Sequence, residues 1–594
     1  MIVIDFETSY TPRTPKGERP HGLGQGKQTV PEYLRDARTE CLGAAVSISK
    51  GGEWKRGYLR GDDLGRVLAA AAAGQFGQVV AHNATFDLSV WARFYPDSYK
   101  VMHQRLTDSP RRVLDTQQLA RWASSQGLLP HLVGVRLAEL GEYYGLAKGD
   151  TAEAVAGDGD LATYAIRDAE ITELIVQDLA GKWPWREAEL AAVHLLMSIP
   201  GPHNLCVNAD LLKPVAEQSE EEKARASWLR KDENFANLLT KLGVPLQYKT
   251  TKTGREKLAL SKTDGFMREL LKHEDKRVRK AAELRLSAGS NINRTRARTM
   301  LDASGEGREA LPLSIMYYAA HTGRSGGSGG MNPQNLPRGG PHRAALTAPP
   351  GHKLVACDAS QIEVRVLAWL AGDEPTLEVF RRGGDPYKAF AVDLYGLDSE
   401  EQVTKEQRQV AKSAVLGLGF GAGPGGYLTY CEIMGVEIDA VEAERVVQAY
   451  RRSKPAVTRY WRALKHIERT GEQVLPSGRR MVYPDMDGET FQRPKPFAPK
   501  GVDTRSRYWH GLFCENAVQA TARDITLAHH AVIIASKYPV VLMVHDEIVC
   551  CVPEGEAQSC LTDMIRIMRT PPEWAEDLPL DAEGTIAYNY GECK

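Results

Sequence analysis

Apolar runs and helical stripes alternate along the first third of the chain. The segment "MIVIDFE" predicts a buried strand, and because side chains two apart in a strand share a face, Asp5 and Glu7 point the same way. The segment "VVAHNATFDLSVW" predicts a short strand followed by a helix that carries Asp87. The pattern of "DLATYAIRDAEITELI" is helical and places Tyr164 and Asp168 on one face. These acids can converge on two divalent cations, which activate a water molecule that cleaves a phosphodiester. The alternative is that the acids are scattered over the surface.

Acids also interrupt the apolar strands of the C-terminal half. The segment "HKLVACDASQIEVRVLAWLAGD" predicts a strand that ends at Asp358 and a helix from about Gln361. Asp358 is there either a helix N-cap or a metal ligand. The segment "VLMVHDEIVC" predicts a hairpin whose tip holds His545, Asp546 and Glu547. A solvated tip explains these acids as well as a metal site does, because carboxylates are usually paired, metal-bound or exposed at a turn.

The segment "RQVAKSAVLGLGFGAG" predicts a helix with one distinctive stripe. Arg408, Lys412, Leu416 and Phe420 recur every four residues. Two cations followed by two apolar side chains suit a triphosphate at one end and a flat base at the other. Three glycines near the end of this helix each cost about 1 kcal/mol relative to Ala, so this end is expected to be soft.

The middle of the chain is helical and charged from about residue 185 to residue 300. Between residues 272 and 298, nine Lys or Arg residues stand against three acids. This excess predicts a phosphate-binding patch that includes Arg294, Arg296 and Arg298, although a solvated helix face has the same composition.

A glycine-rich segment follows the basic helices. Its seven glycines between residues 323 and 340 argue against a regular element and allow a ligand to approach the backbone. Arg324 and Arg338 suit phosphate or base-edge contacts, and Gln334 and Asn335 offer both donors and acceptors. A flexible linker is the alternative.

Composition narrows the class of protein. The 594 residues predict three or four domains, and 42% hydrophobic with 25% charged residues is typical of a soluble globular protein. With a net charge of -1, a polyanion has to be bound by local patches. Nine cysteines without a CxxC pair suit a reducing compartment. No signal peptide or membrane span is predicted, and the Pro- and Gly-rich residues 11–29 predict a mobile loop.

The N-terminal motifs, in this order, resemble the proofreading 3′-to-5′ exonuclease fold of the DEDD superfamily over roughly residues 1–185. The YxxxD spacing of the last motif is similar to that of the Tyr subtype. The resemblance implies two divalent ions bound by Asp5, Glu7, Asp87 and Asp168, with Tyr164 orienting the attacking water.

The C-terminal motifs resemble those of family A DNA polymerases, the DNA polymerase I family, over about residues 187–594. The segment "DASQIEVR" is similar to motif A, "RQVAKSAVLGLGF" to motif B and "VHDE" to motif C. The glycine-rich segment, "LPSGRRMVYP" and "ENAVQATARD" also have family counterparts. With an exonuclease in front and no flap nuclease domain, the layout resembles that of phage replicative polymerases.

The resemblance implies an α/β multidomain fold, in which an RNase H-like exonuclease domain precedes a right-hand polymerase. The expected parts are the exonuclease domain (1–185), a basic helical thumb (186–310), a first part of the palm (311–375), the fingers (376–470) and a second part of the palm (471–594).

It also implies roles in the polymerase site. Asp358 and Asp546 are expected to hold two Mg²⁺ ions, with Mn²⁺ as an alternative, and Glu547 is similar to an auxiliary acid near the primer end. The expected nucleotide contacts are Arg408, Lys412, Leu416, Phe420, Glu363 and Gln361. Lys412 is the expected proton donor to pyrophosphate, and Glu363 is the steric gate against a 2′-hydroxyl. The expected DNA contacts are Arg324, Gln334, Asn335, Arg338, Gln519, His545, Arg294, Arg296 and Arg298; His545 is expected to support its turn.

Three residues depart from the family pattern. Leu416 stands where many members have Phe or Tyr, so discrimination at the sugar 3′ position does not carry over. Phe420 stands where a Tyr commonly bonds the gate glutamate, so Glu363 needs another partner, such as water. Glu515 replaces a common Asn in the helix that contacts the primer.

The expected function is primer extension with dNTPs on a DNA template, with 3′–5′ proofreading, by a monomeric phage replicative polymerase. Its expected place is the host cytoplasm, away from membranes. A processivity factor, a helicase and a single-strand-binding protein are candidate further partners. A catalytically inactive DNA-binding replication factor and a single-subunit RNA polymerase are the alternatives, and Glu363 and the exonuclease motifs argue against the RNA polymerase.

Overall fold

The computed structural model describes most of the chain. The described residues are 1–9, 30–108, 113–148, 160–182, 189, 205–217, 228–229, 231–250, 256–260, 264–288, 292–311, 315–327, 332–497 and 505–593. The loop predicted at residues 11–29 lies outside them.

The N-terminal domain is built on a five-stranded sheet in the order β3-β2-β1-β4-β5. Strand β1 lies in the centre, antiparallel to β2 and parallel to β4. The strands are β1 (Ile2–Thr8), β2 (Cys41–Lys50), β3 (Glu53–Leu59), β4 (Val79–Ala81) and β5 (Val113–Asp115). The helices are α1 (Val30–Arg35), α2 (Gly61–Ala72), α3 (Ala84–Phe94), α4 (Pro96–Asp108), α5 (Thr116–Ser125), α6 (Leu137–Tyr143) and α8 (Leu161–Leu179). Helix α8 packs on β1 and β2, which brings a late helix beside the first strand.

The strands and helices predicted for this domain are confirmed by β1, β4, α3 and α8. Strand β1 is buried along most of its length, because it runs through the middle of a covered sheet. Asp5 and Glu7 therefore lie on a rigid central strand, with α8 packed beside it.

The central body contains a four-stranded antiparallel sheet in the order β17-β18-β12-β19. Its strands are β12 (His352–Ala359), β17 (Val540–Val544), β18 (Glu547–Pro553) and β19 (Ala582–Ala587). The main helices around it are α17 (Ile362–Ala371), α25 (His510–Ala535) and α26 (Ala557–Arg569). The predicted strand ending near Asp358 and the predicted hairpin are confirmed, and the register pairs Asp358 with Glu547.

A helical segment is inserted between β12 and α25. It comprises α18 (Glu374–Arg381), α19 (Pro386–Tyr395), α20 (Lys405–Leu418), α21 (Pro424–Met434), α22 (Ala440–Ser453), α23 (Pro455–Ala463) and α24 (Ile467–Thr470). Thr404 caps α20, accepting a hydrogen bond from the backbone N–H of Gln407, whose side chain accepts one from the Thr404 N–H. The predicted helix is confirmed and ends before Gly419, as its glycines lead one to expect.

The stretch expected to form a thumb contains two kinds of helix. Helices α12 (Asp232–Lys241), α13 (Gly265–Lys272) and α14 (Lys276–Ala288), with the hairpin β7 (Tyr248–Thr250) and β8 (Glu256–Leu258), have a hydrophobic core of their own around Phe235 and Met267. Helices α10 (Ala209–Ala216) and α15 (Ile292–Ala303) instead contribute Leu212 and Met300 to the large core of the rest of the molecule.

Short strand pairs and one small helix lie around the central body, besides several 3₁₀ turns. They are β6 (Cys206–Val207) with β11 (Leu346–Thr347), β9 (Ile315–Met316) with β10 (Gly326–Gly327), β13 (Glu472–Val474) with β14 (Arg480–Val482), β15 (Thr490–Gln492) with β16 (Arg505–Arg507), and α16 (Pro341–Ala344). The glycine-rich segment, predicted to lack regular elements, does contain the two-residue β10 and a 3₁₀ turn at Pro333–Asn335.

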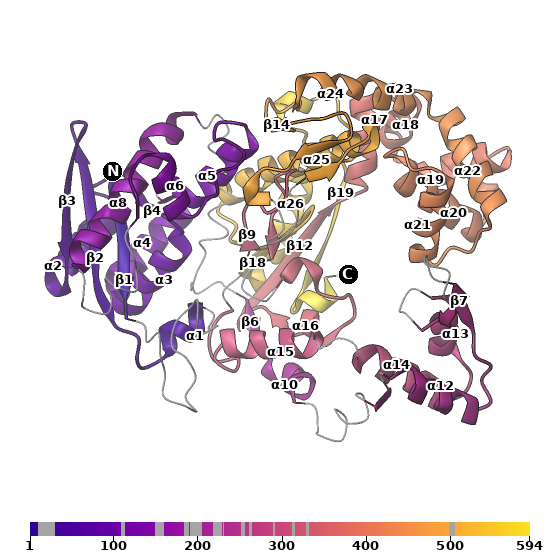
Figure 1. Ribbon diagram of the computed structural model, residues 1–594, viewed down its shortest axis with the longest axis horizontal. Helices are drawn as coiled ribbons and strands as arrows, with labels where there is room; N and C mark the ends of the chain where they lie inside the picture. The colour runs from indigo at the N-terminus through magenta and orange to yellow at the C-terminus, as the bar shows by residue number, and fades with distance from the viewer. Residues whose placement is uncertain are drawn as a thin grey trace.

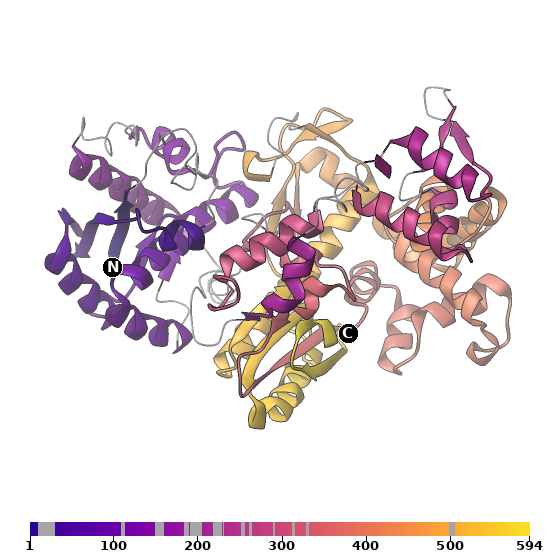
Figure 2. The same ribbon diagram turned by 90° about the horizontal axis from the view of Figure 1, so that it is seen from below.

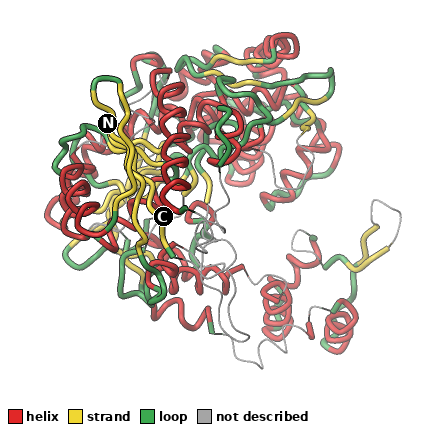
Figure 3. The backbone as a smooth tube through the Cα atoms, turned by 60° about the vertical axis from the view of Figure 1, so that its left-hand side comes forward, coloured by secondary structure: helices red, strands yellow, loops and turns green. Residues whose placement is uncertain are grey.

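The bodies are arranged in a row (Figure 1). The N-terminal domain lies on one side of the central sheet, and helices α12–α14 and α19–α22 lie on the other side. Figure 2, turned by 90°, shows the same order. Figure 3 shows the hairpin β7–β8 among helices, apart from the larger sheets.

Candidate functional sites

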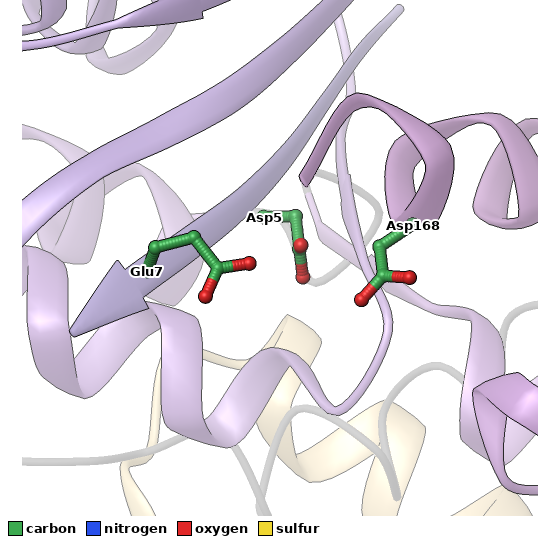
Figure 4. A group of neighbouring side chains, drawn as sticks. All are labelled: Asp5, Glu7 and Asp168. Carbon is green, nitrogen blue, oxygen red and sulfur yellow. The ribbon is translucent and has the colours of Figure 1, made fainter. Parts of the chain in front are cut away.

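Three acids predicted as metal ligands come together in the N-terminal domain. Carboxylate oxygens of Asp5, Glu7 and Asp168 all lie within 4.8 Å of one another. Asp5 and Glu7 come from β1 and Asp168 from α8, and their carboxylates point into one shared space (Figure 4). We call this group the N-terminal acidic site.

Burial and mutual repulsion set the electrostatics of this site. Burial, and then the charge of Asp168, raises the pKa of Asp5 to about 7. Burial, and then Asp5 and Asp168, raises the pKa of Glu7 to about 9. Carboxylates this close cannot all ionise cheaply without a cation, which is the usual signature of a metal or catalytic site.

The other two predicted residues of this site, Asp87 and Tyr164, also lie beside these acids, because the charge of Asp5 helps to raise the pKa of Asp87 after burial and a hydrogen bond from Tyr164 opposes the raised pKa of Asp168. Asp87 is buried on α3, and its Oδ1 accepts a hydrogen bond of 3.0 Å from the backbone N–H of Phe6. It is therefore turned toward β1, and it is not one of the three acids that share the 4.8 Å cluster. Tyr164 lies one turn before Asp168 on α8 and is 8% exposed.

Sequence reasoning missed Lys148, whose ammonium forms an ion pair with Asp168. Lys148 follows α6 in an irregular segment that shows no hydrophobic pattern and matches no motif. No signal in the sequence alone points to it.

A second group of acids, the pair Asp358 and Asp546, lies at the end of the central sheet. Asp358 is near the end of β12, and Asp546 is in the turn between β17 and β18. The backbone N–H of Ala359 donates a 3.3 Å hydrogen bond to the carbonyl of Asp546, which holds the two chain segments side by side. Burial, and then the charge of Asp358, raises the pKa of Asp546 to about 7. His545 has a left-handed backbone with φ of 58°, so it forms the sharp turn that presents Asp546.

Glu547 follows Asp546 directly but has a different environment. Its Oε1 accepts a 2.5 Å hydrogen bond from the Tyr590 hydroxyl and lies 3.7 Å from Nη2 of Arg343. Glu547 is only 6% exposed, so these two partners, which the motifs did not reveal, fix its carboxylate.

The expected gate residue Glu363 has a protein partner. Nη2 of Arg324 donates a 2.7 Å hydrogen bond to Oε1 of Glu363, so the suggested water is replaced by an arginine. The neighbouring Gln519 donates a 3.1 Å hydrogen bond to Glu515. Burial, and then the charge of Glu363, raises the pKa of Glu515. Two predicted primer contacts, Arg324 and Gln519, are thus each bonded to an acid.

The cationic stripe of α20 faces an aromatic ring. Arg408 forms a 2.6 Å ion pair with Asp385, which caps α19, and its guanidinium lies 5.3 Å from the centroid of Tyr387. The ammonium of Lys412 lies 5.9 Å from the same centroid. Both cations are therefore brought together by α19.

The apolar end of the stripe is half-buried. Leu416 and Phe420 pack against the large core, and Phe420 lies beyond the last residue of α20. Gln361 precedes α17, is exposed, and has a left-handed backbone conformation with φ of 48°.

The predicted DNA contacts of the glycine-rich segment and of α15 are partly connected. Nη1 of Arg296 donates a 3.3 Å hydrogen bond to the carbonyl of Asn335, so α15 supports the turn that also holds Gln334. Arg298 forms a 3.1 Å ion pair with Asp302 on its own helix. Arg294 is half-buried and Arg338 is exposed.

Both acidic groups fit hard divalent cations, because they offer carboxylate oxygens alone. Oδ1 of Asp168 is buried and finds no hydrogen-bond partner among the described residues. A buried carboxylate oxygen without a donor suits a cation at this place.

In the described part of the chain, no helix has both the length and the apolar character needed to cross a membrane.

Comparison with known proteins gives a consistent result. The family model described as DNA polymerase family A matches residues 216–592. A DNA polymerase of Bacillus phage SP02 is 32% identical over 279 residues, covering 42% of this chain and 42% of the relative. DNA polymerase I of Pseudomonas aeruginosa is 28% identical over 302 residues, covering 48% of this chain and 30% of the relative. The matches span less than half the length of these relatives.

Among solved structures, the POL domain of Pol1 from M. smegmatis in complex with DNA primer-template and dNTP has a similar fold. The TM-score is 0.67 at 17% sequence identity, and the match covers 93% of this chain and 94% of that chain. This likeness confirms the α/β multidomain polymerase fold predicted from the sequence, and the family match covers more than half of the chain. The chain belongs to DNA polymerase family A.

Proposed function

We propose that this family member is a DNA-directed DNA polymerase that extends a primer 3′ end with dNTPs and proofreads it with a 3′–5′ exonuclease. The observation that carries the polymerase activity is the pair Asp358 and Asp546, whose chain segments are held side by side by the backbone hydrogen bond from Ala359 to Asp546 inside the family match. A bacteriophage replicative role is proposed because DNA polymerases of Bacillus phage SP02 and Mycobacterium phage D29 are among its relatives.

In the polymerase site, Asp358 and Asp546 would hold two Mg²⁺ ions, which supply charge stabilisation and a more acidic 3′-hydroxyl when bound. Arg408 and Lys412 bind the triphosphate, and Lys412 donates a proton to the departing pyrophosphate. Arg408 has to exchange its contact with Asp385 for a phosphate, and an arginine binds either group through the same planar donors.

Glu363 excludes a 2′-hydroxyl by occupying the space beside the sugar. Its carboxylate is held by Arg324, which is also a proposed minor-groove contact of the primer terminus. Primer binding and sugar selection therefore share one side chain. Glu547, held by Tyr590, supports the primer end beside Asp546.

In the N-terminal acidic site, Asp5, Glu7 and Asp168 would hold divalent cations, which supply an activated water when bound. The 4.8 Å cluster of these acids is the observation that supports this activity. Tyr164, one turn away on α8, orients the water. Asp87, whose Oδ1 accepts the Phe6 backbone N–H and whose pKa is raised by burial and then by the charge of Asp5, is proposed as the fourth acid of the metal site.

The test is primer extension and 3′ degradation measured side by side on one primer–template with Mg²⁺. The proposal expects extension with dNTPs and shortening of single-stranded 3′ ends without them. Tight binding of the primer without extension would favour an inactive replication factor, and equal use of NTPs would favour an RNA polymerase.

A further inference from the structure

Lys148 lies inside the N-terminal acidic site although no motif contains it. Its ammonium pairs with Asp168 and lies 5.1 Å from the centroid of the Tyr164 ring. The side chain of Lys148 is 22% exposed and that of Asp168 is 3% exposed. The pair is therefore mostly shielded from water, where salt screens it far less than a surface pair.

The irregular segment that leads from α6 to Lys148 is held at two points. The backbone N–H of Leu146 donates a 2.7 Å hydrogen bond to the carbonyl of Gly141 at the end of α6. The Tyr144 hydroxyl donates a 2.9 Å hydrogen bond to Asp178, on α8. The backbone that leads to Lys148 is thus bonded to the same helix that carries Tyr164 and Asp168. This backbone, and not only the flexible side chain, places the ammonium beside Asp168.

The charge of Lys148 acts on the whole site. Burial raises the pKa of each of the three acids, and Lys148 opposes that rise in every case. Burial lowers the pKa of Lys148 itself, but the charge of Asp168 and hydrogen bonds to Asp168 and Tyr164 outweigh it and raise that pKa. The charge of Lys148 also acts on His82, whose pKa burial, followed by Lys148, lowers to about 3. Lys148 is a cation at neutral pH, and His82 is neutral.

We propose that Lys148 is a positioning residue of the exonuclease site, which holds Asp168 and Tyr164 in place and competes with divalent cations for Asp168. This inference rests on the proposed exonuclease function. A residue in this role weakens metal binding while it orders the side chains that bind and orient water. Its removal therefore changes metal affinity and cleavage rate in opposite directions.

Metal binding is measured by titration calorimetry with Mn²⁺ on the full chain. The parent for this experiment carries D358A and D546A, so that the polymerase site does not contribute. In this parent, Lys148→Met keeps the apolar stem and removes the charge, and Lys148→Arg keeps the charge. We expect K148M to bind Mn²⁺ about threefold to tenfold more tightly than the parent, and K148R to bind like the parent.

Cleavage is measured as single-turnover degradation of a single-stranded 3′ end with Mg²⁺. We expect K148M to slow it about tenfold, and K148R to restore most of the rate. Thermal midpoints show whether the variants fold, and Lys148→Gln replaces K148M if K148M unfolds early.

Unchanged or weaker Mn²⁺ binding by the uncharged variant overturns the inference, and so does an unchanged cleavage rate. If the chain with Lys148 intact does not shorten the 3′ end at all, the proposed exonuclease function fails. The Mn²⁺ titration then decides alone whether Lys148 competes for Asp168.

Discussion

Arg324 donates a 2.7 Å hydrogen bond to Glu363, so the residue proposed to select the sugar is held by a residue proposed to touch the primer. Both side chains are about one-third exposed or less, 28% for Arg324 and 35% for Glu363. The bond is therefore accessible to the substrates that would compete for it. Phe420 has no hydroxyl, so its side chain cannot donate a hydrogen bond to Glu363 in place of Arg324.

This relationship predicts how the enzyme discriminates between sugars. Glu363→Ala is expected to reduce the preference for dNTPs over NTPs by about a hundredfold, because the side chain that blocks the 2′-hydroxyl is lost. Arg324→Met is expected to reduce it by about tenfold, because Glu363 loses its charged partner. The measurement is the ratio of kcat/KM for dNTP and NTP on one primer, in which changes of primer affinity cancel.

A matched variant separates the two roles of Arg324. In the R324M background, Phe420→Tyr adds a hydroxyl for Glu363 and should recover part of the preference for dNTPs. An unchanged dNTP/NTP ratio in R324M would show that Arg324 does not hold the gate.

Divalent cations are expected to stabilise the N-terminal domain more at high pH. The pKa values of Asp5 and Glu7 are raised to about 7 and about 9, so the folded metal-free protein favours their protonated forms. Their contribution to the free energy of unfolding is full below about pH 4 and is lost as the pH rises through these values. Cations favour the ionised forms and counter this loss.

Thermal unfolding with EDTA and with Mg²⁺ measures this effect. The stabilisation by Mg²⁺ should be larger at about pH 8 than at about pH 6. The matched control D5N/E7Q removes both titrating groups and should flatten the difference. Equal stabilisation at both pH values, or an unchanged difference in the control, would contradict the assignment of these acids.

Gly417 is expected to be required for nucleotide binding. An added Cβ at Gly417 would lie 2.7 Å from Cδ1 of Tyr430, so Gly417→Ala has to displace this ring. Burial, and then the charge of the proposed gate residue Glu363, raises the pKa of Tyr430, so the ring lies near the proposed nucleotide site. The helix gains about 1 kcal/mol of propensity, but overpacking costs about 1–3 kcal/mol. We expect an increase of about tenfold in KM for dNTP at a slightly lower thermal midpoint.

The double variant G417A/Y430A tests whether the contact is the cause. It removes the ring that the added methyl group would displace and should bring KM back toward the value of Y430A alone. A normal KM in G417A would mean that the ring moves without consequence.

The buried ion pair of Arg523 and Glu189 supports the backbone next to Arg324. Both terminal nitrogens of Arg523 bond to Glu189, and its Nε donates a 3.0 Å hydrogen bond to the carbonyl of Gly323. Arg523→Met leaves Glu189 charged and buried, which is expected to cost about 3–5 kcal/mol of stability. The loss should appear as a lower midpoint in urea and, because Gly323 precedes Arg324, as a higher KM for the primer.

The double variant R523M/E189M removes both charges and should cost less than R523M alone. If the two single losses add up in the double variant, the pair is not coupled as the contacts imply.

Much of the fold could be predicted from the sequence. Strands β1 and β12, the hairpin β17–β18 and helices α8 and α20 follow directly from the apolar periods, because these periods report which face is buried. Asp5 and Glu7 could be selected because they interrupt an apolar strand, and Asp168 because it shares a helix face with Tyr164.

The contacts between distant segments could not be predicted in this way. Arg324 and Glu363 are 39 residues apart, and Arg523 and Glu189 are 334 residues apart. Such pairs depend on how whole elements pack, which a local pattern does not encode. Lys148 was missed because the segment that carries it has no repeating pattern of apolar residues. Asp87 was selected on a correct helix, yet the direction of its carboxylate depends on the backbone of β1.

One chain is proposed to carry two separate metal-dependent sites. Primer extension and 3′ degradation, measured on one primer–template for Asp546→Ala and Asp5→Ala, test it most directly. We expect D546A to reduce extension about a thousandfold or more and to leave degradation intact, and D5A to do the reverse. If either substitution silenced both activities in a folded protein, the two-site account would be wrong.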